Sequence, residues 1–115
     1  MSFVRINENG YLTDKNGKPF YLVGINFAPR YVKGVFWKEN WNPESIISDL
    51  DKMKSMGLNG IRFPVHWYAF EPEEGKIDPL MMERLDWFMG LCREREIYMH
   101  PWFLVGCGCD MFDIP

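Results

Sequence analysis

A short apolar segment near the middle of the chain ends in side chains that could do chemistry. Arg62, His66 and Trp67 stand in the run RFPVHW, which combines a permanent cation, a titratable imidazole and a large aromatic ring. In parallel β/α proteins the site lies beyond the carboxyl ends of the strands. A strand that ends on these three residues therefore predicts a functional site at that edge of a sheet.

Helix signals flank this segment on both sides. Asn42 as N-cap and Pro43 at the first helical position predict the start of one helix, and Gly57 predicts its end. Asp78 and Pro79 repeat the start signal for a second helix. One face of the first helix is apolar: Ile46, Ile47, Leu50 and Met53. The second helix has a similar stripe: Met81, Leu85, Phe88, Met89 and Cys92.

Three strands are predicted around these helices, over Phe20 to Asn26, Gly60 to Val65 and Ile97 to Phe103. Before the first, a small β-hairpin is expected, with Asn16-Gly17 as a turn signal. The order hairpin, strand, helix, strand, helix, strand is typical of an α/β fold with a parallel sheet and right-handed crossovers. Three such strands leave open sheet edges, so the sequence is interpreted as the opening part of a larger barrel.

Composition excludes several classes of function. A chain of 115 residues with net charge −3 and pI near 5.3 has room for one domain and no basic stripe for nucleic acid. It has no run of about 18 apolar residues for a membrane span. The absence of a signal peptide and the three cysteines favour a cytoplasmic location. Cys107-x-Cys109 lacks the histidines and spacing of a zinc site, so neither metal nor cofactor is expected.

Four motifs in this order resemble clan A glycoside hydrolases, above all family five, the cellulases and mannanases. They are KNGKPFYLVGINF, SDLDKMKSMGLNGIRFPVHW, AFEPEEGKID and ERLDWFMGLCREREIYMHPWF. The resemblance implies an eight-stranded β/α barrel of roughly 250 residues. Residues 1–115 would then be a single partial domain that stops in the loop after the third barrel strand. The implied activity is hydrolysis of O-glycosidic bonds in β-linked oligo- or polysaccharides.

The resemblance also implies where the reactive acids lie. In that family one glutamate at the end of the fourth strand is the acid/base and another at the end of the seventh is the nucleophile, and the reaction retains stereochemistry. Neither can be assigned here, so no catalytic residue is predicted within the 115 residues, and the segment alone is expected to be inactive. Arg62 matches the arginine that hydrogen-bonds the nucleophile; a salt bridge closing the barrel end is the other reading.

Several further residues are candidates for contact with substrate. Asn26, at the family's G-x-N position, is expected either to meet a sugar hydroxyl or to cap the strand end. Trp67 would be a sugar platform or a plug beneath the loop, and His66 a hydrogen-bonding support. Trp102 is a candidate for a sugar subsite, whereas His100 lies about four residues before the family's histidine. A buried core histidine is therefore expected at His100.

The long connection before the first helix is rich in aromatic residues, which would form the wall of a sugar cleft or pack the loop onto the core: Tyr31, Phe36, Trp37 and Trp41. The acids of EPEEGKID are interpreted as a solvated turn rather than catalytic carboxylates. Two other functions stay open: a carbohydrate-binding module or pseudoenzyme that uses its tryptophans without cleavage, and a subunit that completes a barrel with other chains. The sugar, its linkage and the oligomeric state are not specified by the sequence.

Overall fold

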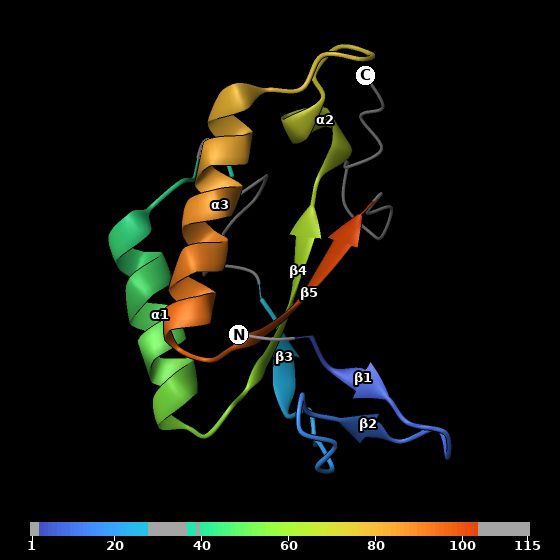
Figure 1. Ribbon diagram of the computed structural model, residues 1–115. Coiled ribbons are helices and arrows are strands. Elements are labelled where there is room, and N and C mark those ends of the chain that lie inside the picture. Colours follow the sequence, from blue (N-terminus) through green and yellow to red (C-terminus); the bar gives the residue numbers. More distant parts are fainter. Residues whose placement is uncertain (1–2, 28–36, 39, 104–115) are drawn as a thin grey trace.

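The computed structural model describes residues 3–27, 37–38 and 40–103 (Figure 1). Over these residues a small antiparallel sheet precedes a three-stranded parallel sheet with the strand order β3-β4-β5. The strands are β1 (Arg5–Ile6), β2 (Leu12–Thr13), β3 (Gly24–Asn26), β4 (Gly60–Val65) and β5 (Tyr98–Phe103). The helices are α1 (Pro43–Ser55), α2 (Trp67–Phe70) and α3 (Pro79–Glu94). The predicted alternation of strands and helices is confirmed, and α2 is an additional short helix.

The N-terminal hairpin is built differently from the prediction. The turn between β1 and β2 lies at residues 7–10, where the Asn7 side chain accepts hydrogen bonds from two backbone N–H groups and Gly10 has φ +82°. Asn16-Gly17 does form a tight turn, with Gly17 at φ +78°. This turn follows β2, and an isolated antiparallel bridge between Thr13 and Pro19 closes it. The predicted turn at Asn16-Gly17 is therefore confirmed, but the hairpin formed by β1 and β2 lies before this turn.

The strand predicted from Phe20 to Asn26 is shorter in the structure, where β3 begins at Gly24. Before Gly24, the side chain of Asn59 bonds to the backbone groups that a neighbouring strand would otherwise pair with. Its amide oxygen accepts from the Val23 N–H at 2.8 Å, and its amide nitrogen donates to the Tyr21 carbonyl at 2.8 Å. These side-chain bonds satisfy the backbone groups that a ladder would otherwise use. Regular pairing with β4 begins at Gly24.

Both long helices begin at the predicted caps. The Asn42 side chain accepts from Ser45 N–H at 3.1 Å, and that of Asp78 accepts from Leu80 N–H at 2.9 Å, each before a proline at N1. After α1, Gly57 has φ +80°, as expected for the residue that ends a helix. The predicted apolar faces are confirmed at their centres, because Ile46, Leu50, Met53, Met81, Phe88 and Cys92 are all buried.

The core lies between the helices and one face of the parallel sheet. Figure 1 shows α1 and α3 side by side on the same side of β3, β4 and β5. From β4, Ile61, Phe63 and Val65 point into this layer, and their exposed fractions are at most 5%. No helix of the described residues covers the other face of the sheet, which carries Gly60, Arg62 and Pro64 of β4 and is called the open face below.

Candidate active site

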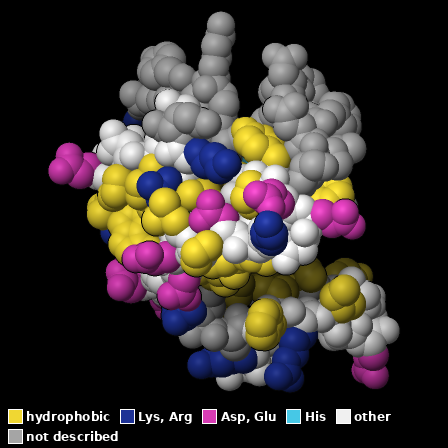
Figure 2. Space-filling model, turned by 90° about the horizontal axis from the view of Figure 1, so that it is seen from above, with side chains coloured by type: hydrophobic (Ala, Val, Ile, Leu, Met, Phe, Trp, Pro, Cys, Tyr) yellow, Lys and Arg dark blue, Asp and Glu magenta, His cyan; other side chains and the backbone are white. Residues whose placement is uncertain are grey.

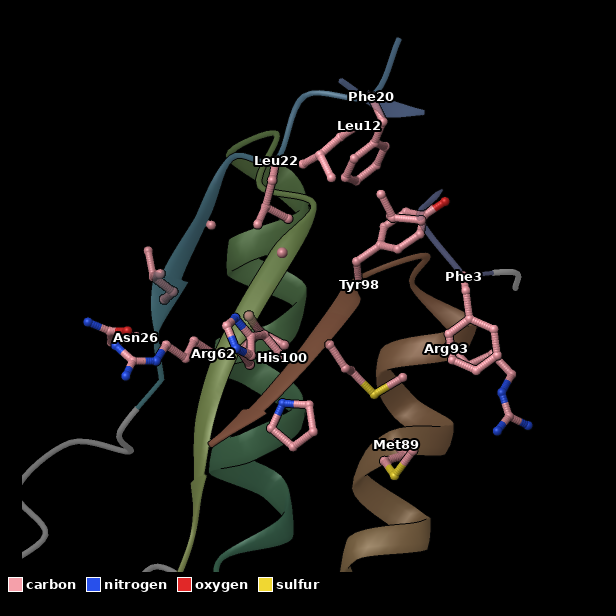
Figure 3. A pocket seen from close by; sticks show the side chains of 17 residues that line it. Phe3, Leu12, Phe20, Leu22, Asn26, Arg62, Met89, Arg93, Tyr98 and His100 are labelled. Carbon is pink, nitrogen blue, oxygen red and sulfur yellow. The ribbon is translucent and has the colours of Figure 1, made fainter. Parts of the chain in front are cut away.

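The open face places three polar residues in one row across the parallel sheet. Asn26 of β3 is in register with Arg62 of β4, and Arg62 is in register with His100 of β5. Residues paired in register point to the same side of a sheet, and Figure 3 shows the three side chains next to one another. We call Asn26, Arg62 and His100 the polar row. The strand alternation thus brings together two residues that the sequence predicted for the site.

His100 was expected to be a buried core histidine, and this prediction is wrong, because its side chain is exposed. The connection from α3 to β5 is short, and Glu96 turns the chain there with φ +54°. His100 therefore occupies the third position of β5, on the open face, whereas the core under the helices receives Ile97 just before the strand. The alternation of side chains along β5 was the signal that could have predicted the face on which His100 lies. The distance from the preceding helix was not.

Arg62 is held by an aromatic ring rather than by an acid. Its guanidinium carbon lies 4.0 Å from the ring centroid of Trp102, which is half-buried. Among the described residues, no carboxylate lies within ion-pair distance of Arg62. For the alternative role, a salt bridge that closes the barrel end, Arg62 has no acidic partner among these residues. The arrangement can accept a carboxylate that comes from elsewhere.

A groove of about 850 Å³ has the polar row at one end and is also lined by Met89 and Arg93 of α3. Its other end is apolar, with Phe20 and Leu22 from the segment after β2, and the Phe20 and Tyr98 rings have centroids 4.5 Å apart (Figure 3). Two glycines form the floor: a Cβ at Gly24 would meet the Gly60 carbonyl oxygen at 2.5 Å. The groove is therefore polar at the polar row and apolar beside the segment that follows β2.

His66 and Trp67 follow β4 and take different positions. His66 is 4% exposed, and burial lowers the pKa of its imidazole below the ordinary value of 6.5. Trp67 is the first residue of α2, is 40% exposed, and donates its indole N–H to Glu71 at 2.7 Å. Neither side chain lines the groove of the polar row. Trp67 therefore offers an exposed aromatic surface on the loop after β4, separate from that groove.

Glu71 organises the loop that carries Trp67. One carboxylate oxygen accepts from the indole, and the other accepts from the Gly75 N–H at 2.6 Å. Both bonds favour the ionised form, and the pKa of Glu71 is lowered, chiefly by the Gly75 N–H and then by the Trp67 indole. The sequence predicted a solvated turn for these acids and missed this role. A four-residue spacing between Trp67 and Glu71, next to Gly75, was the available signal.

Trp37 lies in the core and not on a cleft wall. Its exposed fraction is 0%, its indole N–H donates to the Pro64 carbonyl at 2.7 Å, and its ring packs against Phe63 and Phe88. Arg84 donates to the Trp37 carbonyl and so fixes this part of the connection against α3. Trp37 therefore follows the second alternative, in which the long connection packs onto the core. Tyr31, Phe36, Cys107 and Cys109 lie outside the described residues.

Charge on the end of the molecule above β4 and β5 is mixed in sign. Figure 2 views this end, and where described side chains are drawn, acidic and basic groups alternate around hydrophobic patches. Among the described residues, no group of three or more His, Cys, Asp or Glu side chains is arranged to hold a metal. In the same part of the chain, no helix combines the length and apolar character required to cross a bilayer.

Comparisons with known proteins show that the chain is similar to parts of several glycosidases. No family model matches the chain. A β-galactosidase of Bacillus subtilis is 41% identical over 49 residues, 42% of this chain and 7% of that protein. An exo-β-1,4-mannosidase from Opitutaceae bacterium strain TAV5 is 37% identical with a TM-score of 0.85, over 92% of this chain and 19% of that protein. A family 5 glycoside hydrolase from Bacteroides vulgatus is 19% identical with a TM-score of 0.60, over 85% of this chain and 23% of that protein.

A segment of a family 5 glycoside hydrolase fits these findings. The fold prediction is confirmed: the parallel sheet with its helices is an N-terminal portion of a (β/α)8 barrel. The chain spans about a fifth of the length of these solved relatives. In such a barrel the face without helices is the side that points into the barrel, and the carboxyl ends of the parallel strands lie at the active-site end.

Proposed function

We propose that this chain is part of an enzyme that hydrolyses O-glycosidic bonds of β-linked oligo- or polysaccharides. The observation that carries the proposal is the likeness to an exo-β-1,4-mannosidase, 37% identical over 92% of the chain. The polar row supports it, because its three side chains lie on the face of the sheet that no described helix covers, with Asn26 at the carboxyl end of β3 and Arg62 and His100 at the third positions of β4 and β5. Residues 1–115 are proposed to be a single partial domain of that enzyme.

The proposed mechanism is retaining hydrolysis with two glutamates outside the 115 residues. Their carboxyl groups would stand about 5 Å apart, one to protonate the leaving oxygen and one to attack the anomeric carbon. Arg62 would donate hydrogen bonds to the nucleophile, keeping it ionised and correctly oriented. The absence of an ion-pair partner for Arg62 among the described residues supports this role, because its guanidinium stays available for that acid.

Asn26 and Trp67 are proposed to contact substrate, each in a different way. The Asn26 amide beside Arg62 can exchange hydrogen bonds with a sugar hydroxyl. Trp67 can pack its exposed ring against a pyranose face farther along the bound chain. His66, which is buried and favours its neutral form, is proposed to support this loop from below rather than to transfer protons.

The substrate is proposed to be a β-mannoside, with a β-galactoside as the second candidate. The mannosidase likeness covers 92% of the chain, whereas the β-galactosidase likeness covers 42%. An assay of the longest natural protein that contains this segment on 4-nitrophenyl β-mannoside, β-galactoside and β-glucoside would separate them. We expect the highest kcat/KM on the mannoside. Highest activity on the galactoside would reverse the order, and no hydrolysis of any of the three would contradict the glycosidase proposal.

The 115-residue segment by itself is proposed to be inactive, because both catalytic glutamates are proposed to lie outside it. Purified segment should release no nitrophenol from the same three glycosides above the uncatalysed rate, while the longer protein does. Hydrolysis by the segment alone would place the reactive acids among residues 1–115 and would refute their assignment elsewhere.

A non-catalytic role in carbohydrate binding is the alternative function, and the exposed Trp67 favours it. It predicts that the longer protein binds β-linked oligosaccharides, measured by isothermal titration, without releasing reducing sugar. The glycosidase proposal predicts binding and release together.

A further inference from the structure

We propose that Trp102 is a positioning residue for Arg62 and not a sugar-binding platform. This inference rests on the proposed function, because the group that Arg62 is to hold is the nucleophilic carboxylate of a glycosidase. It changes the role that the sequence suggested for Trp102, which was a sugar subsite on the third barrel strand.

The stack between the two side chains follows from strand register. Arg62 pairs with His100 and Pro64 pairs with Trp102, so Trp102 is the diagonal neighbour of Arg62 on the open face. The guanidinium carbon is 4.0 Å from the indole centroid, well inside the range of about 6 Å for a cation over an aromatic face. Arginine, unlike lysine, can lie flat on such a ring.

A guanidinium that lies flat on an aromatic ring is oriented without the use of its hydrogen-bond donors. All five N–H groups of an arginine lie in the plane of the fork, and a ring that covers this plane leaves the edges free. Among the described residues no carboxylate pairs with those edges. The indole thus holds the plane of Arg62 fixed while its edges remain open to a bidentate contact with an incoming acid.

The same stack removes part of the indole from contact with substrate. The ring face that the guanidinium covers is closed to a sugar, and Trp102 is half-buried in the sheet. Trp102 does not line the groove of the polar row either. Its indole therefore acts on the reaction through Arg62.

The test compares Trp102→Phe and Trp102→Leu in the longest natural protein that contains the segment, by the pH profile of kcat/KM. The acidic limb of that profile reports the pKa of the nucleophile in the free enzyme. Because Arg62 lowers this pKa, a less firmly held guanidinium moves the acidic limb to higher pH. We expect this move, and roughly a tenfold loss of kcat with little change in KM, for Trp102→Leu. Trp102→Phe, which retains a ring face, should stay close to the parent enzyme.

Other outcomes would overturn the inference. A platform for sugar predicts a raised KM and an unmoved acidic limb in Trp102→Leu. A merely structural role predicts that thermal stability falls while the limb stays in place. Phe103→Leu is the matched control, since it removes an exposed ring from the next position of the same strand, and its profile should coincide with that of the parent.

Failure of the inference and failure of the proposed function give different results. If the parent protein hydrolyses no glycoside, the proposed function fails, and the stack is then tested by NMR of the same protein labelled at arginine. The ring current of Trp102 should shift the Arg62 Hδ resonances upfield in the parent and in Trp102→Phe, but not in Trp102→Leu. Unshifted Arg62 resonances in the parent would refute the stack itself.

Discussion

Arg62 has a permanent charge at a half-buried position and no acidic partner among the described residues. Side-chain donors left unpaired in a partly buried site cost free energy unless something else satisfies them. The Trp102 ring offsets part of this cost through its π face. An acid supplied by another part of the enzyme would satisfy the remaining donors, which links the residue geometry to the proposed catalytic role.

The first prediction concerns the clamp between Glu71 and Trp67. Glu71→Gln should loosen the indole, because the single amide oxygen of glutamine must serve both the Trp67 N–H and the Gly75 N–H, which the two carboxylate oxygens of Glu71 accept separately. We expect the Trp67 indole proton to exchange with solvent roughly threefold to tenfold faster, measured by NMR. Glu74→Gln is the matched control, as Glu74 is an exposed neighbour in the same loop. Equal exchange in the two variants would show that Glu71 does not hold the ring.

The second prediction concerns the pH dependence of stability at His66. Burial lowers the pKa of His66 in the folded chain below 6.5, so the unfolded chain binds more protons between the folded and unfolded pKa values. The free energy of unfolding should therefore be fully retained above pH 6.5 and should fall as the pH decreases below that value.

Chemical unfolding of the parent protein and of His66→Gln at a series of pH values tests this prediction. His66→Gln should flatten the slope between pH 7 and pH 5, because it removes the imidazole whose pKa burial lowers. A slope unchanged by His66→Gln would mean that another group governs the pH dependence.

At the scale of elements, the helices were predictable because local chemistry specifies where each begins and ends. Asn42 and Asp78 accept backbone N–H groups that the first helical turn leaves unpaired, and a proline follows each of them. The strands were harder, since their limits depend on residues distant in sequence. Asn59 shortens β3 from 36 residues away, whereas β4 has the predicted bounds Gly60–Val65, and the short helix α2 that follows it was not predicted. Such effects are absent from any local pattern.

The third prediction concerns the helix caps. Asn42→Ala and Asp78→Ala should each lower the free energy of unfolding by about 1 kcal/mol, because the capped N–H groups lose their acceptors. Urea denaturation of the purified protein measures this change. Ser48→Ala, at an exposed position inside α1, is the control and should leave stability unchanged or slightly raised, since alanine favours helix. Equal effects of all three substitutions would mean that the caps do not stabilise the helices.

At the scale of the whole molecule, the sheet has one covered face and one open face. Exposed apolar residues lie along the open edges and the hairpin, among them Phe3, Leu22, Ile25 and Phe103. The sequence predicted this unfinished architecture from the order of its elements, and it predicted Asn26 and Arg62 at the site from the ends of two strands. It misplaced His100, because a residue's face depends on the exact start of β5. It did not decide whether Trp37 lies on a cleft wall or in the core, because the path of a long connection depends on tertiary packing.

The most direct test of the account is to trap the nucleophile in the longest natural protein that contains this segment. A 2-deoxy-2-fluoro-β-mannosyl fluoride should leave a sugar attached to one carboxylate, which peptide mass spectrometry identifies and a crystal structure locates. We expect the label on a glutamate outside residues 1–115, with its carboxylate about 3 Å from the Arg62 guanidinium. A label on a residue within 1–115, or a labelled glutamate far from Arg62, would contradict the account.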